Sequence, residues 1–347
     1  MKLWRDCVLT GIYTLSPTHC GTGQTTGAVD LPVARDAATG FPILPATSLK
    51  GVARDYCERT DNGDGDGDGS LTRDQLNWLF GKTVEDVQKD LEGSTETEDP
   101  SQQKPVQLEA GALVFTEGRL IAYPVRSLNY PFLYATCPMI LKRLARDLRA
   151  LDMEFLPEEC LDMAVEPQQI KVASGTFAGK TLVLEDLIYE ANEVAELTGL
   201  QRLGERLSAL LPKTEQDTRE QLSNNLVLIP DEDFEDLMQR TIPVQARIKL
   251  TSLKTTGKTE DGESGNLWYE ENLPSDCLFL SFIGERRQRL SASEKVSSDS
   301  SSKGAINAVE VLRSVRNRLA TVQLGGNETV GQGLCLWNFW SPEGAVQ

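Results

Sequence analysis

Strand-like and helix-like segments follow one another along this 347-residue chain without the strict alternation that builds a parallel sheet. Residues 8–15 (VLTGIYTL) are rich in β-branched and aromatic side chains, and they predict a strand that ends at the Ser16-Pro17 turn. Residues 244–257 and 266–274, separated by a turn rich in Gly and Glu, predict a β-hairpin. This order of elements favours an α+β fold with antiparallel pairing over a doubly wound sheet.

The remaining segments predict helices and short strands in irregular order. Helices are predicted at 48–56, 73–80, 138–151 and 308–319. Strands are predicted at 41–44, 112–115, 119–125, 227–230, 277–285 and 334–340, with strand-like sequence also at 168–190. The first helix follows Pro45, and Thr47 or Ser48 is its expected N-cap. The polar residues 92–106 predict a loop.

Composition limits the class of protein. A hydrophobic content of 39% is enough for a packed core, and no run of about 18 apolar residues predicts a membrane-spanning helix. The N-terminal sequence lacks the apolar centre of a signal peptide, so we expect a cytoplasmic protein without a membrane partner. Seven scattered cysteines without a CxxC pair fit neither a disulfide framework nor a zinc site. We expect them to be buried in a reducing compartment.

The net charge of −17 argues at first against a nucleic-acid partner, but the charge is unevenly distributed. Residues 55–110 hold 15 acids and 5 bases, and residues 154–240 hold 19 acids and 7 bases. The rest of the chain is therefore slightly basic and is able to present a local surface that attracts phosphates.

The stretch from Ser16 to Arg54 contains the parts needed to act on a phosphodiester. Its single histidine, His19, stands eleven positions before Asp30, and the residues between them are rich in Gly and Thr. An acid–base group and a carboxylate on a pliable loop suit cleavage of RNA through the 2′-hydroxyl, directly or by holding a metal ion. A lone histidine is more often structural, and a salt bridge from Asp30 to Arg35 is the simpler alternative.

The helix start PATSLKGVAR (45–54) offers free backbone N–H groups together with two cations, Lys50 and Arg54, one turn apart. Gly51 would let an RNA backbone approach closely. This combination suits a phosphate contact, although an ordinary helix with solvated cations remains the alternative.

The run GGNETVGQG contains the glycines Gly325, Gly326, Gly331 and Gly333. It matches neither GxGxxG nor the P-loop pattern, so it does not support a nucleotide site. A structural turn and a contact to the RNA backbone are equally compatible with it.

Residues 64–75 (DGDGDGSLTRDQ) nearly match a calcium-binding loop. Asp64, Asp66 and Asp68 stand at the first three ligand positions, but Gln75 replaces the bidentate acid. We therefore expect either a weak calcium site or a solvated insertion.

Taken in order, these motifs resemble the backbone subunit of Cmr-type (type III-B) CRISPR effectors in the RAMP superfamily. The segments that carry the resemblance are 17–24, 27–36, 39–54, 79–81, 122–128, 136–138, 266–274 and 325–333. The most specific among them are VDLP (29–32), the helix start at 45–54 and PVRS (124–127).

The resemblance implies a modified RRM-like (ferredoxin-like) palm with a β-hairpin thumb at about 244–274. It implies that several copies stack head to tail along a CRISPR guide RNA, together with other effector-complex subunits, in antiviral defence. The thumb would kink the guide–target duplex, and a loop aspartate would cleave the target RNA at regular intervals.

Roles for single residues follow from the same resemblance. Asp30 corresponds to the cleaving aspartate, His19 to the loop histidine, and Glu270 or Glu271 to an acid beside the thumb. Lys50 corresponds to a contact with a guide phosphate. Cleavage would be metal-dependent, with Mg or Mn as the cofactor and the 2′-hydroxyl as the nucleophile.

The domain expected is a single RAMP-type unit over 1–347, with an acidic insertion at about 55–110 and a Ser-rich insertion at 292–304. Two alternative functions remain open. In the first alternative the chain is a non-catalytic RNA-binding scaffold of such a complex. In the second it is a guide-processing endoribonuclease in which His19 is the general base.

Overall fold

A computed structural model describes residues 3–59, 71–95, 110–160, 162–252, 254–257, 265–287 and 307–341. The predicted calcium ligands Asp64, Asp66 and Asp68 lie outside these ranges, as does the Ser-rich segment 292–304.

Four long strands form the centre of the molecule. They are β1 (Cys7–Thr14), β4 (Gly118–Arg126), β13 (Leu278–Glu285) and β15 (Leu334–Phe339), and they lie in the order β15-β1-β13-β4 with antiparallel neighbours. Helix α1 (Ala46–Glu58) connects the first two of these strands along the chain, and α8 (Ala308–Ser314) connects the last two. This is the strand order of a ferredoxin-like fold, so the predicted α+β palm is confirmed.

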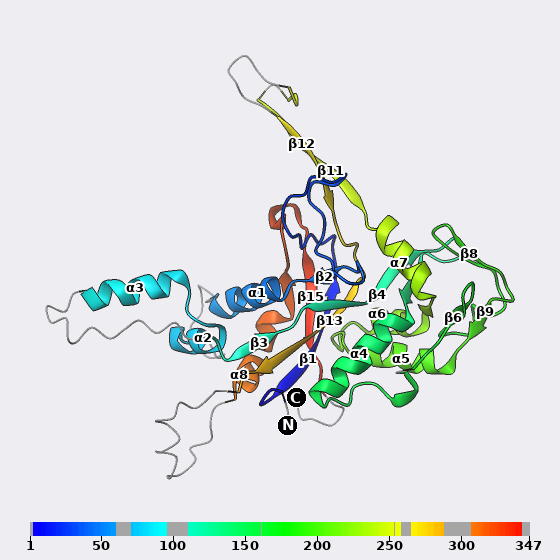
Figure 1. The fold of residues 1–347 in the computed structure, drawn as a ribbon, viewed down its shortest axis with the longest axis horizontal. Coiled ribbons are helices and arrows are strands. Elements are labelled where there is room, and N and C mark those ends of the chain that lie inside the picture. Colours follow the sequence, from blue (N-terminus) through cyan, green and yellow to red (C-terminus); the bar gives the residue numbers. More distant parts are fainter. Residues whose placement is uncertain are drawn as a thin grey trace, which may run out of the picture.

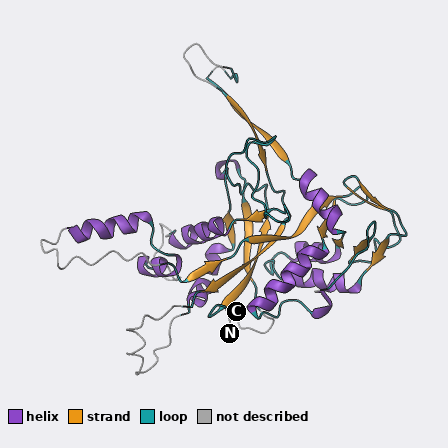
Figure 2. Ribbon diagram, viewed as in Figure 1, coloured by secondary structure: helices purple, strands orange, loops and turns teal. Residues whose placement is uncertain are grey.

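The central strands are buried because helices cover them. Every residue of β13 is buried, as is every residue of β1 after Cys7, which explains their nearly continuous apolar sequence. Helix α4 (Pro138–Leu151) packs against β4 and α8 packs against β13. Figure 2 shows the strands in the middle of the molecule with helices on either side.

Long connections between these core elements carry the rest of the structure. Residues 15–42 lie between β1 and β2 (Ile43–Leu44), and the connection after α1 holds α2 (Arg73–Phe80), α3 (Val84–Thr95) and β3 (Leu113–Phe115). The connection from β4 to β13 adds β5 (Phe132–Thr136), β6 (Ile170–Val172), β7 (Leu182–Leu184), β8 (Leu187–Tyr189), β9 (Val194–Glu196), β10 (Leu226–Leu228), α5 (Thr198–Ser208), α6 (Gln216–Asn224) and α7 (Asp231–Arg240). Strands β5, β10, β6 and β9 extend the main sheet beyond β4.

The predicted hairpin is formed by β11 (Val244–Lys249) and β12 (Asn266–Glu271), and it projects away from the sheet (Figure 1). Residues that face each other across the two strands share a face of the hairpin. One face therefore carries Val244, Ile248, Leu267 and Tyr269, whose side chains are 44–56% exposed. A strip of large exposed apolar side chains is typical of an interaction surface, so this face is a candidate binding surface.

Three local predictions need correction. Helix α1 begins at Ala46 with Pro45 as its N-cap, not Thr47 or Ser48, because the fixed φ of Pro45 suits a helix entrance and its carbonyl accepts the Leu49 N–H. The loop predicted from residue 92 begins later, because α3 continues to Thr95. The helix predicted at 308–319 is α8 followed by a 3₁₀ turn at Arg316–Leu319.

The cysteines behave as the composition suggests. All seven are free thiols, and all but Cys7 are buried. Among the described helices, none combines the length and the apolar character that crossing a bilayer requires.

Candidate functional site

Asp30 lies at the foot of the hairpin, where the chain after it runs beside strand β12. The Leu31 N–H donates to the Tyr269 carbonyl at 3.0 Å, and the Glu271 N–H donates to the Leu31 carbonyl at 2.9 Å. The Asp30 carboxylate itself accepts the Tyr269 N–H through Oδ2 at 2.8 Å. The alternative of a salt bridge to Arg35 is wrong, since the Arg35 guanidinium pairs with Glu271 at 3.2 Å.

His19 lies on the opposite arm of the same loop and also contacts the hairpin. Its Nδ1 is 2.7 Å from the Glu271 carbonyl oxygen, which only accepts, so Nδ1 carries the proton. In the tautomer with one proton on Nδ1, Nε2 is the nitrogen that accepts a hydrogen bond. A Cβ at Gly21 would lie 2.5 Å from Nε2, so glycine at this position leaves room for the ring.

The two arms are joined to each other below the exposed part of the loop. Gly21 forms an antiparallel bridge with Val33, and the Ala34 N–H donates to the Cys20 carbonyl at 2.7 Å. Residues 21–28 between the arms are exposed throughout. The structure therefore brings His19, Asp30 and Glu271 together and holds the pliable segment at its two ends.

The two neighbouring glutamates of β12 point to opposite faces of the hairpin, as alternation along a strand requires. Glu271 Oε2 accepts the Val33 N–H at 3.0 Å. Glu270 is only 2% exposed, and its Oε1 accepts the Asn327 side-chain amide at 2.6 Å with Arg247 at 3.6 Å. Glu270 is thus part of a buried polar network beneath the hairpin.

The glycine-rich run packs against the arm that carries His19. Gly325 has a φ of +81° and lies so close that a Cβ would be 2.0 Å from the His19 carbonyl oxygen. The next N–H, that of Gly326, donates to the same oxygen at 3.1 Å. Gly333, also with a φ of +81°, donates to the Pro17 carbonyl at 2.8 Å. These glycines have structural reasons to be present, whereas a Cβ at Gly326 would meet open space. A Cβ at Gly331 would also meet open space, but its φ of +76° is a conformation that favours glycine.

Lys50 is half-buried near the start of α1, and burial together with the nearby charge of Arg54 lowers its pKa. The first turn of this helix has no side-chain cap. Gly51 is exposed, and a Cβ there would contact nothing in the protein. An incoming anionic group would therefore meet a cation beside uncapped backbone N–H groups.

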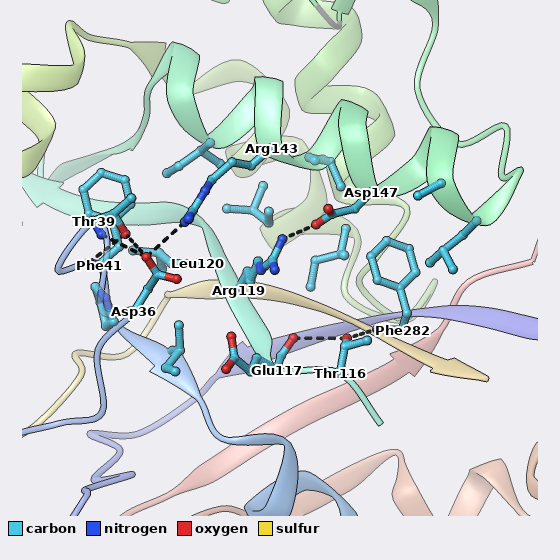
Figure 3. A pocket seen from close by; sticks show the side chains of 18 of the residues that line it. Asp36, Thr39, Phe41, Thr116, Glu117, Arg119, Leu120, Arg143, Asp147 and Phe282 are labelled. Atoms are coloured by element: carbon cyan, nitrogen blue, oxygen red, sulfur yellow. Dashed lines mark hydrogen bonds and ion pairs between the residues drawn. The ribbon is translucent and has the colours of Figure 1, made fainter. Parts of the chain in front are cut away.

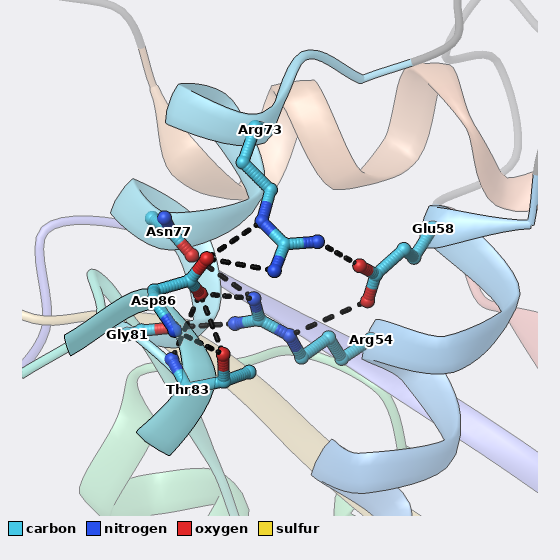
Figure 4. Close-up of polar contacts among 7 residues, drawn as sticks. All are labelled: Arg54, Glu58, Arg73, Asn77, Gly81, Thr83 and Asp86. Carbon is cyan, nitrogen blue, oxygen red and sulfur yellow. Dashed lines mark hydrogen bonds and ion pairs between the residues drawn. The ribbon is translucent and has the colours of Figure 1, made fainter. Parts of the chain in front are cut away.

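Arg54 points into a polar cluster that joins α1 to α2 and α3 (Figure 4). Its guanidinium donates to the Gly81 carbonyl and to Asn77 Oδ1 at 2.9 Å, and it lies 3.5 Å from Asp86. The Arg54 side chain is only 13% exposed. The guanidinium is thus engaged within the protein and is poorly placed for the phosphate contact that its position in the sequence suggested.

A cavity of about 250 Å³ separates α4 from the sheet (Figure 3). Its walls are mainly apolar, and two ion pairs cross it, Asp36–Arg143 at 3.2 Å and Arg119–Asp147. Burial alone would raise the pKa of Asp36, but hydrogen bonds from Thr39 and Arg143 outweigh burial and lower it. None of the candidate site residues lines this cavity, so it is separate from the Asp30 loop.

A metal site is not complete within the described residues. No three His, Cys, Asp or Glu side chains among them gather closely enough to hold an ion. Asp30 offers one carboxylate oxygen, Oδ1, besides the Oδ2 that accepts the Tyr269 N–H. The described residues therefore do not by themselves complete the ligand set of a divalent metal.

The contacts that hold the site together gave no sequence signal. Arg35, Gly21 and the Tyr269 backbone hold the loop, yet Asp30 and Tyr269 are 239 residues apart along the chain. Only the Asp36-x-x-Thr39 turn, which follows the loop, is recognisable from its sequence.

Comparison with known proteins places this fold among characterised families. The family model described as the RAMP superfamily matches residues 11–335. The chain is 29% identical over 330 residues to the CRISPR system Cmr endoribonuclease Cmr4 of Pyrococcus furiosus, covering 94% of this chain and 92% of that protein. It is 23% identical over 335 residues to the CMR subunit Cmr4 of Saccharolobus solfataricus, covering 93% of each chain.

Solved structures agree on the fold. Oligomeric Cmr4 from P. furiosus superposes with a TM-score of 0.63 at 22% identity, covering 96% of this chain and 97% of that one. A chain of the type III-B Cmr-beta complex bound to cognate target RNA gives a TM-score of 0.63 at 19% identity, covering 97% and 98%.

Proposed function

Because this chain belongs to the RAMP superfamily, we propose that it is the guide-RNA-binding backbone subunit of a type III-B CRISPR effector and that it cleaves the target RNA at regular intervals. The related protein from P. furiosus carries the name endoribonuclease and spans nearly the whole chain, which supports an enzymatic role. Related chains form oligomers and occur in a complex with target RNA, which supports stacked copies, other subunits and RNA as partners.

The observation that carries the proposal is the position of Asp30 beside the foot of a projecting hairpin. One carboxylate oxygen is fixed by the Tyr269 N–H at 2.8 Å, which leaves the other oxygen for a reacting group. In the proposed reaction a ribose 2′-oxygen attacks the adjacent phosphorus, and Asp30 takes the proton of the 2′-hydroxyl. The 5′-oxygen leaves and is protonated by solvent, which gives a 2′,3′-cyclic phosphate and a 5′-hydroxyl.

The exposed apolar face of the hairpin supports a role in spacing the cuts. Asp30 is bonded to the backbone of Tyr269, whose exposed side chain shares a face of the hairpin with Leu267. We propose that these two side chains separate stacked bases of a bound duplex. An unstacked nucleotide has a flexible backbone, which helps its 2′-oxygen to align with the phosphorus. Lys50 at the start of α1 is the proposed contact with a guide phosphate.

Magnesium or manganese is the proposed cofactor. In many phosphate-handling sites Mg²⁺ is held by one or two carboxylates, substrate phosphates and water. Because the described residues offer a single suitable carboxylate at Asp30, an ion would depend on the RNA for further ligands. Removing divalent ions with a chelator should stop cleavage without releasing the bound RNA.

The decisive experiment replaces Asp30 by asparagine in the assembled complex. We expect D30N to bind guide and target RNA normally and to cut at least about a hundredfold more slowly, since it loses the general base. Asp55→Asn, an exposed acid on α1, is the matched control and should cut at the normal rate. Normal cutting by D30N would instead support a non-catalytic scaffold, an alternative consistent with the engagement of Asp30 by the hairpin backbone.

A further inference from the structure

We infer that Glu271 is a positioning residue that closes the Asp30 loop onto the hairpin, and that its carboxylate takes no part in the reaction itself. This inference rests on the proposed cleavage by Asp30. It differs from an assignment of Glu271 as a reacting acid or a metal ligand, and the two assignments predict different results.

Glu271 contacts both arms of the loop at once. Its carbonyl accepts from His19 Nδ1 at 2.7 Å on the outgoing arm. Its N–H donates to the Leu31 carbonyl at 2.9 Å on the returning arm, directly after Asp30. The side chain then reaches two residues further and accepts the Val33 N–H at 3.0 Å. One residue of β12 therefore bonds to three residues of the loop.

Both carboxylate oxygens of Glu271 are already in use. Oε2 accepts from Val33, and Oε1 accepts from Arg35 at 3.2 Å, while the side chain is only 13% exposed. A hydrogen bond to an ionised group in such a place is stronger than one between neutral groups. A metal ion or a substrate proton would have to displace these partners before it reached the carboxylate.

Arg35 transmits this attachment to the rest of the protein. Its Nη1 donates to the Met238 carbonyl at 2.9 Å, near the end of α7, and to the Gly40 carbonyl at 3.0 Å. The guanidinium thus links the hairpin, the returning arm and a helix of the β4–β13 connection. Because these anchors lie outside the exposed segment 21–28, they fix the place of Asp30 while that segment stays accessible.

The ion pair between Glu271 and Arg35 predicts how the effects of two substitutions combine. If Glu271 acts through Arg35, removing either partner releases the same arm, so the two losses should not multiply. If Glu271 reacts or binds metal, its loss should add to that of Arg35 and should alter the dependence on metal concentration.

The test uses the complex assembled with guide RNA and compares Glu271→Gln, Arg35→Met and the double variant. Glu271→Gln keeps the shape of the side chain and all backbone contacts of residue 271. Single-turnover cleavage, target affinity and the Mg²⁺ concentration for half-maximal rate are measured for each. The surface pair Glu159–Arg202 at α5 provides the matched control in Glu159→Gln and Arg202→Met.

We expect each single variant to slow cleavage by about tenfold, the double variant to be no slower than the slower single, and the Mg²⁺ midpoint and target affinity to be unchanged. Cuts should also spread to neighbouring phosphodiesters, because a loosened arm no longer selects one position. Multiplied losses, a shifted Mg²⁺ midpoint in Glu271→Gln, or normal cleavage by both singles would overturn the inference.

Hydrogen exchange separates failure of this inference from failure of the proposed function. The Leu31 and Val33 amides should exchange faster in Glu271→Ala than in the natural protein, whether or not the complex cleaves RNA. Unchanged exchange at both amides would refute the closing role even if Asp30 proves to be catalytic.

Discussion

Asp86 holds the first insertion onto the palm, and replacing it by alanine should release that insertion while leaving the sheet intact. Asp86 is 8% exposed and accepts the Thr83 N–H at 3.0 Å and the Thr83 hydroxyl at 2.7 Å. It also accepts Arg73 Nε at 2.8 Å and lies 3.5 Å from Arg54 (Figure 4). One carboxylate thus joins the starts of α2 and α3 to α1.

The magnitude follows from burial. Losing one partner of a buried ion pair costs about 3–5 kcal/mol, since the other charge remains buried. Arg73 is 44% exposed and regains water, whereas the 13% exposed Arg54 keeps only Glu58 at 3.7 Å as an acidic partner. We therefore take the lower limit, about 3 kcal/mol, which corresponds to roughly a hundredfold change in a local opening equilibrium.

Hydrogen exchange followed by mass spectrometry is the appropriate measurement. Amides of α2 should exchange roughly a hundredfold faster in Asp86→Ala, while those of β1 and β13 should keep their rates. Asp74→Ala, which removes an exposed acid from the first turn of α2, is the control for charge alone. A less than threefold change in α2, or equal loss in the central strands, would refute this account of the cluster.

The same cluster predicts a dependence on pH. Burial alone would raise the pKa of Asp86, but hydrogen bonds from Thr83 and Arg73 outweigh burial and hold the pKa far below its usual range. A carboxyl whose pKa is lower in the folded state stabilises that state above its unfolded pKa of about 3.9. Protection of α2 in the natural protein should therefore decline as the pH falls below about 4. The Asp86→Asn variant should lack that part of the decline.

Two further outcomes test the loop and the guide contact. Gly325→Ala should lower the free energy of unfolding by at least about 1–2 kcal/mol in urea denaturation, because alanine is strained at the left-handed φ of this position. Its Cβ would also collide with the His19 carbonyl oxygen, so the variant should cleave RNA more slowly. Gly326→Ala should stay within about 0.5 kcal/mol, and equal losses in the two variants would contradict the packing described. Lys50→Ala should lower the slope of log affinity for guide RNA against log salt by about 1, measured by filter binding. Lys142→Ala, an exposed cation on α4, should leave that slope unchanged, and a Lys50 variant with an unchanged slope would remove Lys50 from the interface.

The sequence predicted a helix well where its buried side chains recur with the helical period. Helix α4 was predicted with its observed bounds because Ile140, Leu144 and Leu148 recur on one buried face. Helix α6 gave no such signal, since Leu222 is its only fully buried residue, and α7 opens with acids that resemble a solvated loop. These helices depend on tertiary contacts that no local window contains.

The site was predictable only in part, for a related reason. Asp30 and His19 were selected as candidates through their motif and residue types, and the structure places both beside the hairpin. Their anchors are backbone groups and Glu271, which are more than 230 residues away along the chain. Alternation along β12 requires Glu270 and Glu271 to point apart. Which of them faces the loop depends on the docking of Leu31 at the edge of that strand.

The distance between the two halves of this site has a consequence for biosynthesis. Residues 19–35 leave the ribosome long before Tyr269 and Glu271, which lie 239 and 252 residues beyond their partners Asp30 and His19. At about 5–20 residues per second, the delay is roughly 12 to 50 s. During that interval Asp30 has no hairpin to hold it. A truncated chain that ends before β12 should therefore lack an ordered Asp30 arm, so under the proposed function only completed subunits would cleave RNA.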